Sequence, residues 1–383
     1  MMKKLNFEPV LSTDKENLLR QQVRDFLADY GTIPASEIID SWTVCDPDFS
    51  RLLAKQGWIG MTWPSEYTGA NRSYLERYVV IEELLAAGAP VGAHWVADRQ
   101  SGPLLLRFGT EQQRQFFLPQ IVRGECFFAI GMSEPNSGSD LASIKTTAKR
   151  VDGGWVVNGS KIWTSWAQVC HYMITLCRTA PVSDNRHAGL SQLIVDLSSE
   201  GITIRPIKNM AGEEHFNEIF FDDVFVPDEH VAGKVNDGWS QVMAELAFER
   251  SGPERFLSSY QLLEESIKIL RQGEPSSQVD SVIGQLIAKL MVLRQMSLSV
   301  ASQLHEGKLP VNEASVVKDL GTSFEQELPE ALRSIISIEA RSGAEQGVAR
   351  MLSDSILKSP SFSLRGGTRE ILRGIIARGL GLR

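Results

Sequence analysis

The chain has few cysteines, and none of them is spaced for metal binding. Its 383 residues include four cysteines, at positions 45, 126, 170 and 177. They form no Cys-x-x-Cys pair, and the six histidines show no ligand spacing, so the pattern gives no indication of a metal site. The first residues, MMKKLNFEPV, have two lysines but no apolar run behind them, unlike a secretory signal. We therefore expect reduced thiols in a cytoplasmic protein.

An excess of basic charge and a long apolar run are also missing. The net charge is -8, which argues against a nucleic-acid partner because neutralising phosphates needs a basic surface. No apolar stretch is long enough for a bilayer, so we expect no membrane partner. The composition, 43% hydrophobic and 22% charged, is that of a globular protein, and the length predicts two or three layers or subdomains.

Three common catalytic motifs are missing as well. No G-x-G-x-x-G follows a strand, which leaves a Rossmann cofactor site unsupported. The segment GWVVNGSK at 154–161 is close to a phosphate-binding loop, but it has Ser160-Lys161 where Lys-Ser/Thr is needed. No G-x-S-x-G elbow indicates a serine hydrolase.

The residues that are present predict the order helix, strand, helix. Thr13 and Glu16 form a capping box before a helix at 13–30, and helical patterns continue to about residue 123. Residues 124–236 are rich in strand-forming segments, with Asn158-Gly159 predicting a hairpin turn. Helical patterns return at 237–383. The predicted fold class is α+β, with domains at 1–123, 124–236 and 237–383.

Two segments of the central region could carry chemistry. In FFAIGMSEPNSGSDLASIKTTAKR (127–150), Gly138 lets a ligand approach the backbone, and Ser133 and Ser139 offer hydrogen-bond donors. In KIWTSWA (161–167), Trp163 could pack on a flat ring and Ser165 could bond its edge. By spacing alone, a polar turn beside a core tryptophan explains these residues slightly better.

Three stretches resemble the acyl-CoA dehydrogenase family, over nearly the whole chain. GMSEPNSGSDLASIKTTAKRVDGGWVVNGSKIWTS is similar to its flavin-binding signature, FNEIFFDDVFVPDEHVAGKVNDGW to the exit of its β domain, and RGGTREILRGIIARGLGL to its C-terminal signature. The resemblance implies a helical N-terminal domain, a central antiparallel β domain and a C-terminal four-helix bundle.

The resemblance also implies FAD-dependent oxidation of an acyl thioester in fatty-acid metabolism. A carboxylate removes the α-proton while the β-carbon gives a hydride to flavin N5, which yields a trans-2-enoyl thioester. Electrons then pass to an electron-transfer flavoprotein. By position, the implied FAD contacts are Ile130, Met132, Ser133, Ser139, Trp163, Ser165, Thr368 and Glu370, and the implied substrate contacts are Ser139, Arg250 and Gly367.

The catalytic base is predicted away from the C-terminal signature. Many members carry it just before the Gly-Thr pair, where this chain has Gly366. In a subgroup that includes isovaleryl- and long-chain-type members, the base lies on a helix directly before an arginine. The residue at that position in this chain is Glu249, which precedes Arg250. On a helix Glu249 falls within an apolar stripe formed by Trp239, Val242, Leu246, Pro253 and Phe256.

Other charged residues near the signature receive structural interpretations. The alternative role for Glu249 is an ion pair that braces helices. Glu245 and Glu254 are predicted to be solvated, and Arg365 is predicted to be a surface arginine, with binding of a polar acyl group or a phosphate as the alternative.

The chain departs from the family pattern at two motifs. It lacks the Arg-x-x-Phe-Gly stretch and the later Gln-x-x-Gly-Gly turn that hold the adenosine half of FAD. We therefore expect a homo-oligomer (dimer or tetramer) or a heteromer with a sister chain, acting on a CoA or carrier-protein thioester. The alternatives are a flavin oxidase or monooxygenase, or a flavin-poor subunit of a heteromer.

Overall fold

The structure, a computed structural model, describes residues 4–31, 33, 38–336 and 344–382, apart from the side chains of 244–249 and 344–345. Its contacts form two compact units. The sheet unit contains residues 45–71 and 91–248, and the helical unit contains residues up to 44, 72–90 and those from 249 onward. Each unit therefore draws on separate stretches of the chain, and the three-domain division stays a prediction.

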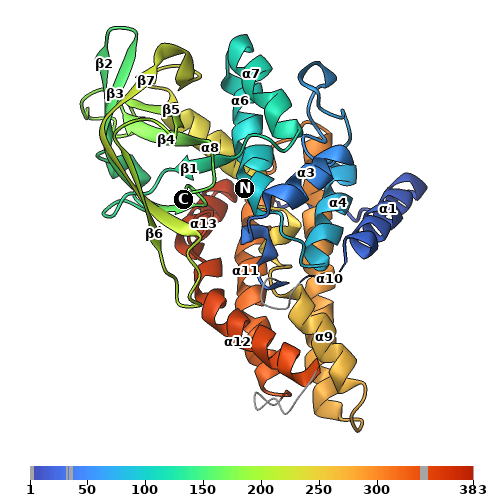
Figure 1. Cartoon of the computed structure of the whole chain (residues 1–383). Helices are drawn as coiled ribbons and strands as arrows, with labels where there is room; N and C mark the ends of the chain where they lie inside the picture. Colours follow the sequence, from blue (N-terminus) through green and yellow to red (C-terminus); the bar gives the residue numbers. More distant parts are fainter. Residues whose placement is uncertain (1–3, 32, 34–37, 337–343, 383) are drawn as a thin grey trace. The chain divides into compact units, whose positions relative to one another are not determined.

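An eight-stranded sheet dominates the sheet unit (Figure 1). Its strand order is β6-β7-β3-β2-β4-β5-β8, and β1 pairs with β4. The pairings are antiparallel except β1 with β4 and one residue pair between β2 and β4. The predicted β region is confirmed, with this parallel addition. The strands are β1 (Phe128–Gly131), β2 (Thr147–Val151), β3 (Gly154–Ser165), β4 (Tyr172–Arg178), β5 (Leu190–Asp196), β6 (Ile202–Ile207), β7 (Phe216–Pro227) and β8 (Val231–Ala232).

The predicted hairpin turn at Asn158-Gly159 is wrong. Strand β3 runs straight through it, and the turn lies at 152–153, where Gly153 has φ +71°. Asn158 instead exchanges two hydrogen bonds with Asp223 on β7, and the register shifts there by one residue. The turn-forming dipeptide thus stays extended and faces a β-bulge on β7, where residues 222 and 223 oppose Asn158 and Asp223 has φ +51°.

Burial alternates along much of β3 and β7, whereas nearly every residue of β4 and β5 is buried. On β3 the apolar Trp155 and Val157 enter a core with Met173, Val195 and Ile219 from neighbouring strands. Burying such side chains contributes about 1.5–3 kcal/mol each. The same unit contains helices α3 (Pro47–Lys55), α5 (Gly92–Val96), α6 (Gly102–Phe108), α7 (Glu111–Val122) and α8 (Gly238–Glu249), and the short segments η2 (Ser65–Tyr67), η3 (Ala97–Ser101), η4 (Leu141–Ser143) and η5 (Asp228–His230).

The helical unit packs long helices against one another. Helix α11 contacts α10, α12 and α13, and α4 contacts α1 and α10 (Figure 1). The predicted capping box at the start of α1 is present, with Thr13 and Glu16 bonded to each other's backbone. The elements of this unit are α1 (Asp14–Tyr30), η1 (Ser41–Thr43), α4 (Tyr74–Ala86), η6 (Pro253–Arg255), α9 (Tyr260–Leu270), α10 (Ser277–His305), α11 (Val311–Arg333), α12 (Ala344–Phe362) and α13 (Arg369–Gly379).

The apolar stripe predicted around Glu249 does not lie on one helix. Helix α8 ends at Glu249, and a separate 3-10 turn, η6, begins at Pro253. The prediction that Glu254 is solvated is also wrong, because this residue lies on a turn whose side chains are buried. Its side chain is fully buried, 3.6 Å from the Nε of Arg255. The side chain of Glu245 lies outside the described residues.

Two further findings concern the thiols and the membrane. The four cysteines are free thiols. Within the part of the chain that the structure describes, no helix has the length and apolar content to cross a bilayer. The cytoplasmic location stays a prediction.

Candidate active site

The turn that follows β1 holds the first group of predicted FAD contacts. Ile130 pairs with Ile174 on β4, and Met132 and Ser133 follow at the strand end, all partly exposed. The carbonyl of Ser133 accepts a hydrogen bond from Ile162 N, at 2.9 Å. The three predicted residues therefore lie at the end of β1 and on the turn after it, which is hydrogen-bonded to β3.

A buried ion pair between Lys161 and Glu134 holds this turn in place. The Nζ of Lys161 donates to Met132 O at 3.1 Å and to Glu134 Oε1 at 2.9 Å. Glu134 also accepts from the backbone N–H groups of Lys145 and Thr146, at 2.6 and 2.9 Å. The Lys161 side chain is completely buried. Sequence analysis missed it, although alternation along β3 places it among inward-facing positions.

The contacts of Glu134 keep it ionised. Burial opposes ionisation, but the attraction of Lys161 and the two backbone hydrogen bonds outweigh it and lower the pKa of this carboxyl. A charge that is buried yet fully hydrogen-bonded holds its neighbours rigidly. Lys161 and Glu134 thus set the position of Met132 and Ser133.

Strand β3 presents Trp163 at a second bulge. The register against β7 shifts between Lys161 and Thr164, and Trp163 has φ +62°. A bulky residue with positive φ is strained, by about 1–2 kcal/mol. The indole is 55% exposed and meets Phe216 edge-on, with centroids 5.8 Å apart. The core alternative for Trp163 is therefore wrong. Ser165 is the last residue of β3 and is partly buried.

The serine and glycine of the polar loop are open. Ser139 is exposed, and a Cβ added at Gly138 would meet nothing within 4 Å. The loop is tied at its ends, because Ser137 Oγ donates to Asp140 O at 2.6 Å. The loop can accept a ligand without displacing a protein side chain.

The C-terminal turn of the helical unit carries the remaining predicted contacts. Gly366 and Gly367 have φ values of +67° and +93°, and Thr368 caps α13. Glu370 is exposed, and its pKa is lowered by its own backbone N–H and by the Thr368 hydroxyl. The left-handed conformation at 366 disfavours any side chain there, which gives a physical reason for a glycine where a carboxylate could stand.

Two buried cations hold the carbonyl groups of this turn. Arg250 is 2% exposed, and its Nε donates to Gly366 O at 3.3 Å. Lys318 on α11 is completely buried, and its Nζ donates to Gly367 O at 2.7 Å. The predicted substrate residues Arg250 and Gly367 are therefore adjacent. The Glu249 side chain lies outside the described residues, but its backbone ends α8 directly before Arg250.

Arg365 is not the surface arginine that the sequence predicted. Its side chain is 16% exposed and bonds both carboxylate oxygens of Asp40, at 2.8 and 2.9 Å. The surface prediction fails because Asp40 lies 325 residues earlier in the chain and is itself buried.

Comparisons with known proteins identify the family. Models of the acyl-CoA dehydrogenase N-terminal, middle and C-terminal domains match residues 13–125, 129–224 and 236–381. The acyl-CoA dehydrogenase FadE26 of Mycobacterium tuberculosis is 30% identical over 95% of this chain and 96% of its own length. The chain belongs to the acyl-CoA dehydrogenase family.

Other similar proteins extend this assignment. The acyl-CoA dehydrogenase FadE34 of Mycobacterium tuberculosis is 35% identical over 86% of this chain, but the match spans 45% of that relative. A structure described as the Tcur3481-Tcur3483 steroid ACAD is 28% identical, with a TM-score of 0.87 over 97% of this chain and 98% of its own. The ChsE4-ChsE5 complex of Mycobacterium tuberculosis contains a chain that is 29% identical, with a TM-score of 0.85 over 98% of this chain and 99% of its own.

Acyl-CoA dehydrogenases are in general FAD-dependent flavoproteins. The described residues fit such a group. The indole of Trp163 is exposed despite its strained backbone, the space around Gly138 is open, and the buried hydroxyl of Thr164 has no hydrogen-bond partner in the protein. An orphaned buried hydroxyl calls for an explanation, and aromatic rings with a few polar groups line ligand sites.

Proposed function

We propose that this chain is an FAD-dependent acyl-CoA dehydrogenase that oxidises an acyl thioester to the trans-2-enoyl thioester. Glu249 removes the α-proton. Ile130, Met132, Ser133, Ser139, Trp163, Ser165, Thr368 and Glu370 hold the cofactor, and Ser139, Arg250 and Gly367 hold the thioester.

The observation that supports this role for Glu249 is the contact between Arg250 and Gly366. Position 366 is where many family members are expected to carry the base, and here its left-handed glycine cannot supply one. Arg250 lies against this glycine, with its Nε 3.3 Å from the carbonyl oxygen. Glu249 directly precedes Arg250, with consecutive Cα atoms about 3.8 Å apart, so it neighbours a residue whose side chain contacts this turn.

The protein groups then have separate tasks. Glu249 needs a raised pKa to accept a weakly acidic proton, which exclusion of water by the bound thioester would provide. Gly367 lets the thioester approach the backbone closely, and Arg250 fixes the turn beside it. Bound FAD supplies the oxidising group that accepts the hydride from the β-carbon.

The test is an anaerobic titration with a panel of acyl-CoA thioesters, monitoring the band of oxidised flavin. We expect one thioester to bleach it, and Glu249→Gln to slow bleaching at least about 100-fold, because the general base is lost. Glu330→Gln, an exposed carboxylate on α11, is the matched control and should bleach at the wild-type rate. Rapid bleaching by Glu249→Gln would exclude Glu249 as the base.

The name of one structural relative suggests which thioesters to include. That relative is described as a steroid ACAD. We propose that bulky ring-containing acyl groups are candidates beside short and branched ones. Turnover of short straight chains alone would contradict this extension and leave the reaction itself intact.

We also propose that the chain works as an oligomer and passes its electrons to an electron-transfer flavoprotein. The adenosine motifs are missing, and Arg271, the nearest substitute, is an exposed residue at the end of α9. A homologous structure is described as a complex of two chains. Native mass spectrometry of the chain, alone and co-expressed with a sister chain, will distinguish a homo-oligomer from a heteromer and count the bound FAD.

A further inference from the structure

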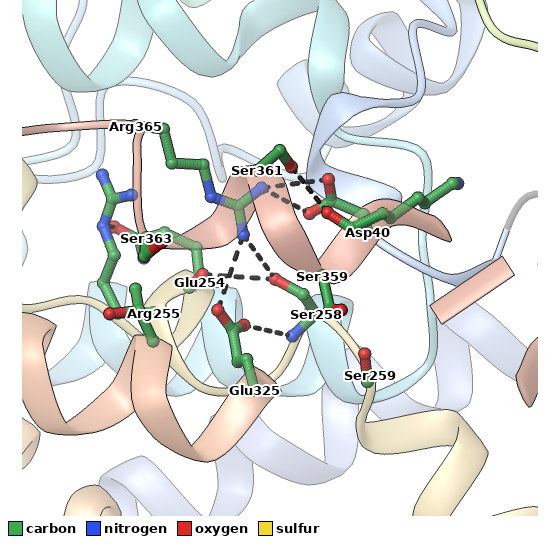
Figure 2. A network of polar contacts seen from close by, with 12 residues as sticks. Asp40, Glu254, Arg255, Ser258, Ser259, Glu325, Ser359, Ser361, Ser363 and Arg365 are labelled. Atoms are coloured by element: carbon green, nitrogen blue, oxygen red, sulfur yellow. Dashed lines mark hydrogen bonds and ion pairs between the residues drawn. The ribbon is translucent and has the colours of Figure 1, made fainter. Parts of the chain in front are cut away.

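A buried polar cluster lies in the helical unit, beside the C-terminal turn (Figure 2). Its members come from four separate stretches of the chain: Asp40 before η1, Ser258 after η6, Glu325 on α11 and Arg365 after α12. Asp40, Ser258 and Glu325 are each less than 5% exposed. Charged groups are rarely buried without a purpose, because their desolvation is costly.

Arg365 is the centre of this cluster. One of its terminal nitrogens donates to both oxygens of Asp40, at 2.8 and 2.9 Å. The other donates to Ser258 Oγ at 2.9 Å and lies 3.6 Å from Glu325 Oε2. The planar guanidinium also stacks on Trp42, with its central carbon 4.3 Å from the ring centroid. Only arginine combines a planar fork with aromatic stacking in this way.

The partners of Arg365 are themselves held in place. Asp40 has a left-handed backbone, with φ 61° and ψ 37°, and its N–H donates to Ser258 O at 2.8 Å. The N–H of Ser258 donates to Glu325 Oε1 at 3.0 Å. A strained backbone persists only where its surroundings determine it. The cluster is therefore a rigid anchor and not a loose surface contact.

This anchor joins directly to the turn. Arg365 is the residue before Gly366, and two consecutive glycines have little conformational preference of their own. Arg250 and Lys318 hold the carbonyls of Gly366 and Gly367. The conformation of this turn must therefore be fixed by other residues, which are Arg365 before the glycines and Arg250 and Lys318 on their carbonyl groups.

We propose that Arg365, held by Asp40, Ser258 and Glu325, is a positioning residue that fixes the Gly366-Gly367-Thr368 turn for the cofactor and the thioester. Nothing in the cluster touches the reacting atoms; it acts through the backbone. This inference rests on the proposed function for its role in the reaction, but the fixing of the turn can be measured separately.

Glu325 adds a dependence on pH. Burial raises its pKa to about 7, against the lowering effects of Arg365 and the Ser258 N–H, and Asp40 raises it further. The buried charged residues on α11 and on the segments that pack with it are Asp40 before η1, Glu254 and Arg255 on η6, Lys318 on α11, and Lys358 and Arg365 on and after α12. Above neutral pH Glu325 is ionised, and its pairing with Arg365 becomes charge-assisted.

The test compares Arg365→Lys and Asp40→Asn with Arg373→Gln. Arg365→Lys keeps the charge and loses the fork, which protects the fold from an unpaired buried Asp40. Arg373 on α13 is 62% exposed, pairs with Asp319 and lies outside the cluster. The first measurement is hydrogen–deuterium exchange in peptides covering residues 363–374. We expect exchange about tenfold faster in the two cluster variants and unchanged in Arg373→Gln, with the thermal transition cooperative in all three.

The second set of measurements is the affinity for FAD and the separate values of kcat and KM for each variant. A turn displaced by about 1 Å can slow the chemistry about 100-fold, so we expect kcat to fall more than KM rises in Arg365→Lys. In the wild type kcat/KM should rise as pH passes about 7, and Glu325→Gln should remove this rise.

The outcomes separate the two claims. Unchanged exchange and unchanged kcat in folded Arg365→Lys and Asp40→Asn would overturn the positioning role. Suppose instead that the two cluster variants exchange faster, but that no thioester bleaches the flavin of the wild type. This result would support the anchoring of the turn and would count against the proposed reaction.

Discussion

The two units of the molecule each fasten a turn with a buried carboxylate, but in different ways. In the sheet unit, Glu134 has Lys161 and two backbone N–H groups on its oxygens, and its pKa is lowered. In the helical unit, Glu325 has an oxygen without a hydrogen-bond partner, 3.6 Å from Arg365, and its pKa is raised to about 7. Burial raises the pKa of both carboxyl groups, and only at Glu134 do the attraction of a nearby cation and the hydrogen bonds outweigh it.

The comparison predicts different roles for the two clusters. A fully bonded pair remains ionised at neutral pH and serves as a permanent brace. A carboxyl group with fewer hydrogen bonds, such as Glu325, titrates near neutral pH, and so the contacts that hold the neighbouring turn depend on pH.

The largest expected effect is on stability, from breaking the brace in the sheet unit. Lys161→Met leaves Glu134 buried without its cation, which should cost about 3–5 kcal/mol of unfolding free energy. The measurement is denaturant unfolding near neutral pH. Lys149→Met, an exposed lysine on β2, is the control and should change stability by less than about 0.5 kcal/mol. A loss below about 1 kcal/mol for Lys161→Met would show that the pair contributes little.

The next effect has opposite signs in the two units. An unfolded glutamate ionises near pH 4.5, whereas Glu325 keeps its proton to about pH 7. Between these values the folded state binds more protons, so stability should fall as pH rises from about 4.5 to about 7 and then level off. For Glu134 the pKa is lowered, so its contribution is present above the unfolded pKa and is lost as pH falls.

Urea unfolding from pH 2 to pH 8 will show both trends. Glu325→Gln should remove the falling limb, which amounts to about 3 kcal/mol for a pKa raised from 4.5 to about 7. Glu134→Gln should remove the loss of stability in acid. Parallel curves for wild type and Glu325→Gln would mean that Glu325 does not titrate in this interval.

The smallest expected effect concerns the turn itself. Gly366→Ala must take a left-handed conformation with a side chain, at a cost of about 1 kcal/mol. Gly284→Ala on the exposed face of α10 should instead stabilise by about 0.5–1 kcal/mol, because alanine suits a helix better than glycine does. Thermal unfolding of the two variants measures this contrast, and equal shifts would contradict the strain at residue 366.

Local signals in the sequence predicted the local structure well. The capping box of Thr13 and Glu16 has side chains and backbone within four residues, and it forms as expected. The turn at residue 153 and the Asn158-Gly159 pair carry similar turn chemistry, and only pairing with β7 decides which of them bends the chain. Pairing partners distant in sequence are what a single chain does not reveal.

The helical unit gives a similar lesson for charged residues. Lys318 and Glu325 lie in a buried stripe on α11 with Ala314, Gly321 and Leu328, at spacings of three and four residues. The argument that selected Glu249, a charge within an apolar stripe, would have found both. Arg365 has no such signal, because it follows a helix and its partners lie hundreds of residues away.

The way the two units alternate along the chain has a consequence during synthesis. Every residue of the sheet unit lies before residue 249, whereas the helical unit combines residues up to 44 and 72–90 with the last third of the chain. Helix α4, which packs against both α1 and α10, leaves the ribosome long before α10 exists. The buried side chain of Tyr78 must therefore remain without Leu298 and Ala301 while more than 150 further residues are added, at about 5–20 residues per second. The same division gives the sheet unit a complete set of residues before the helical unit can close.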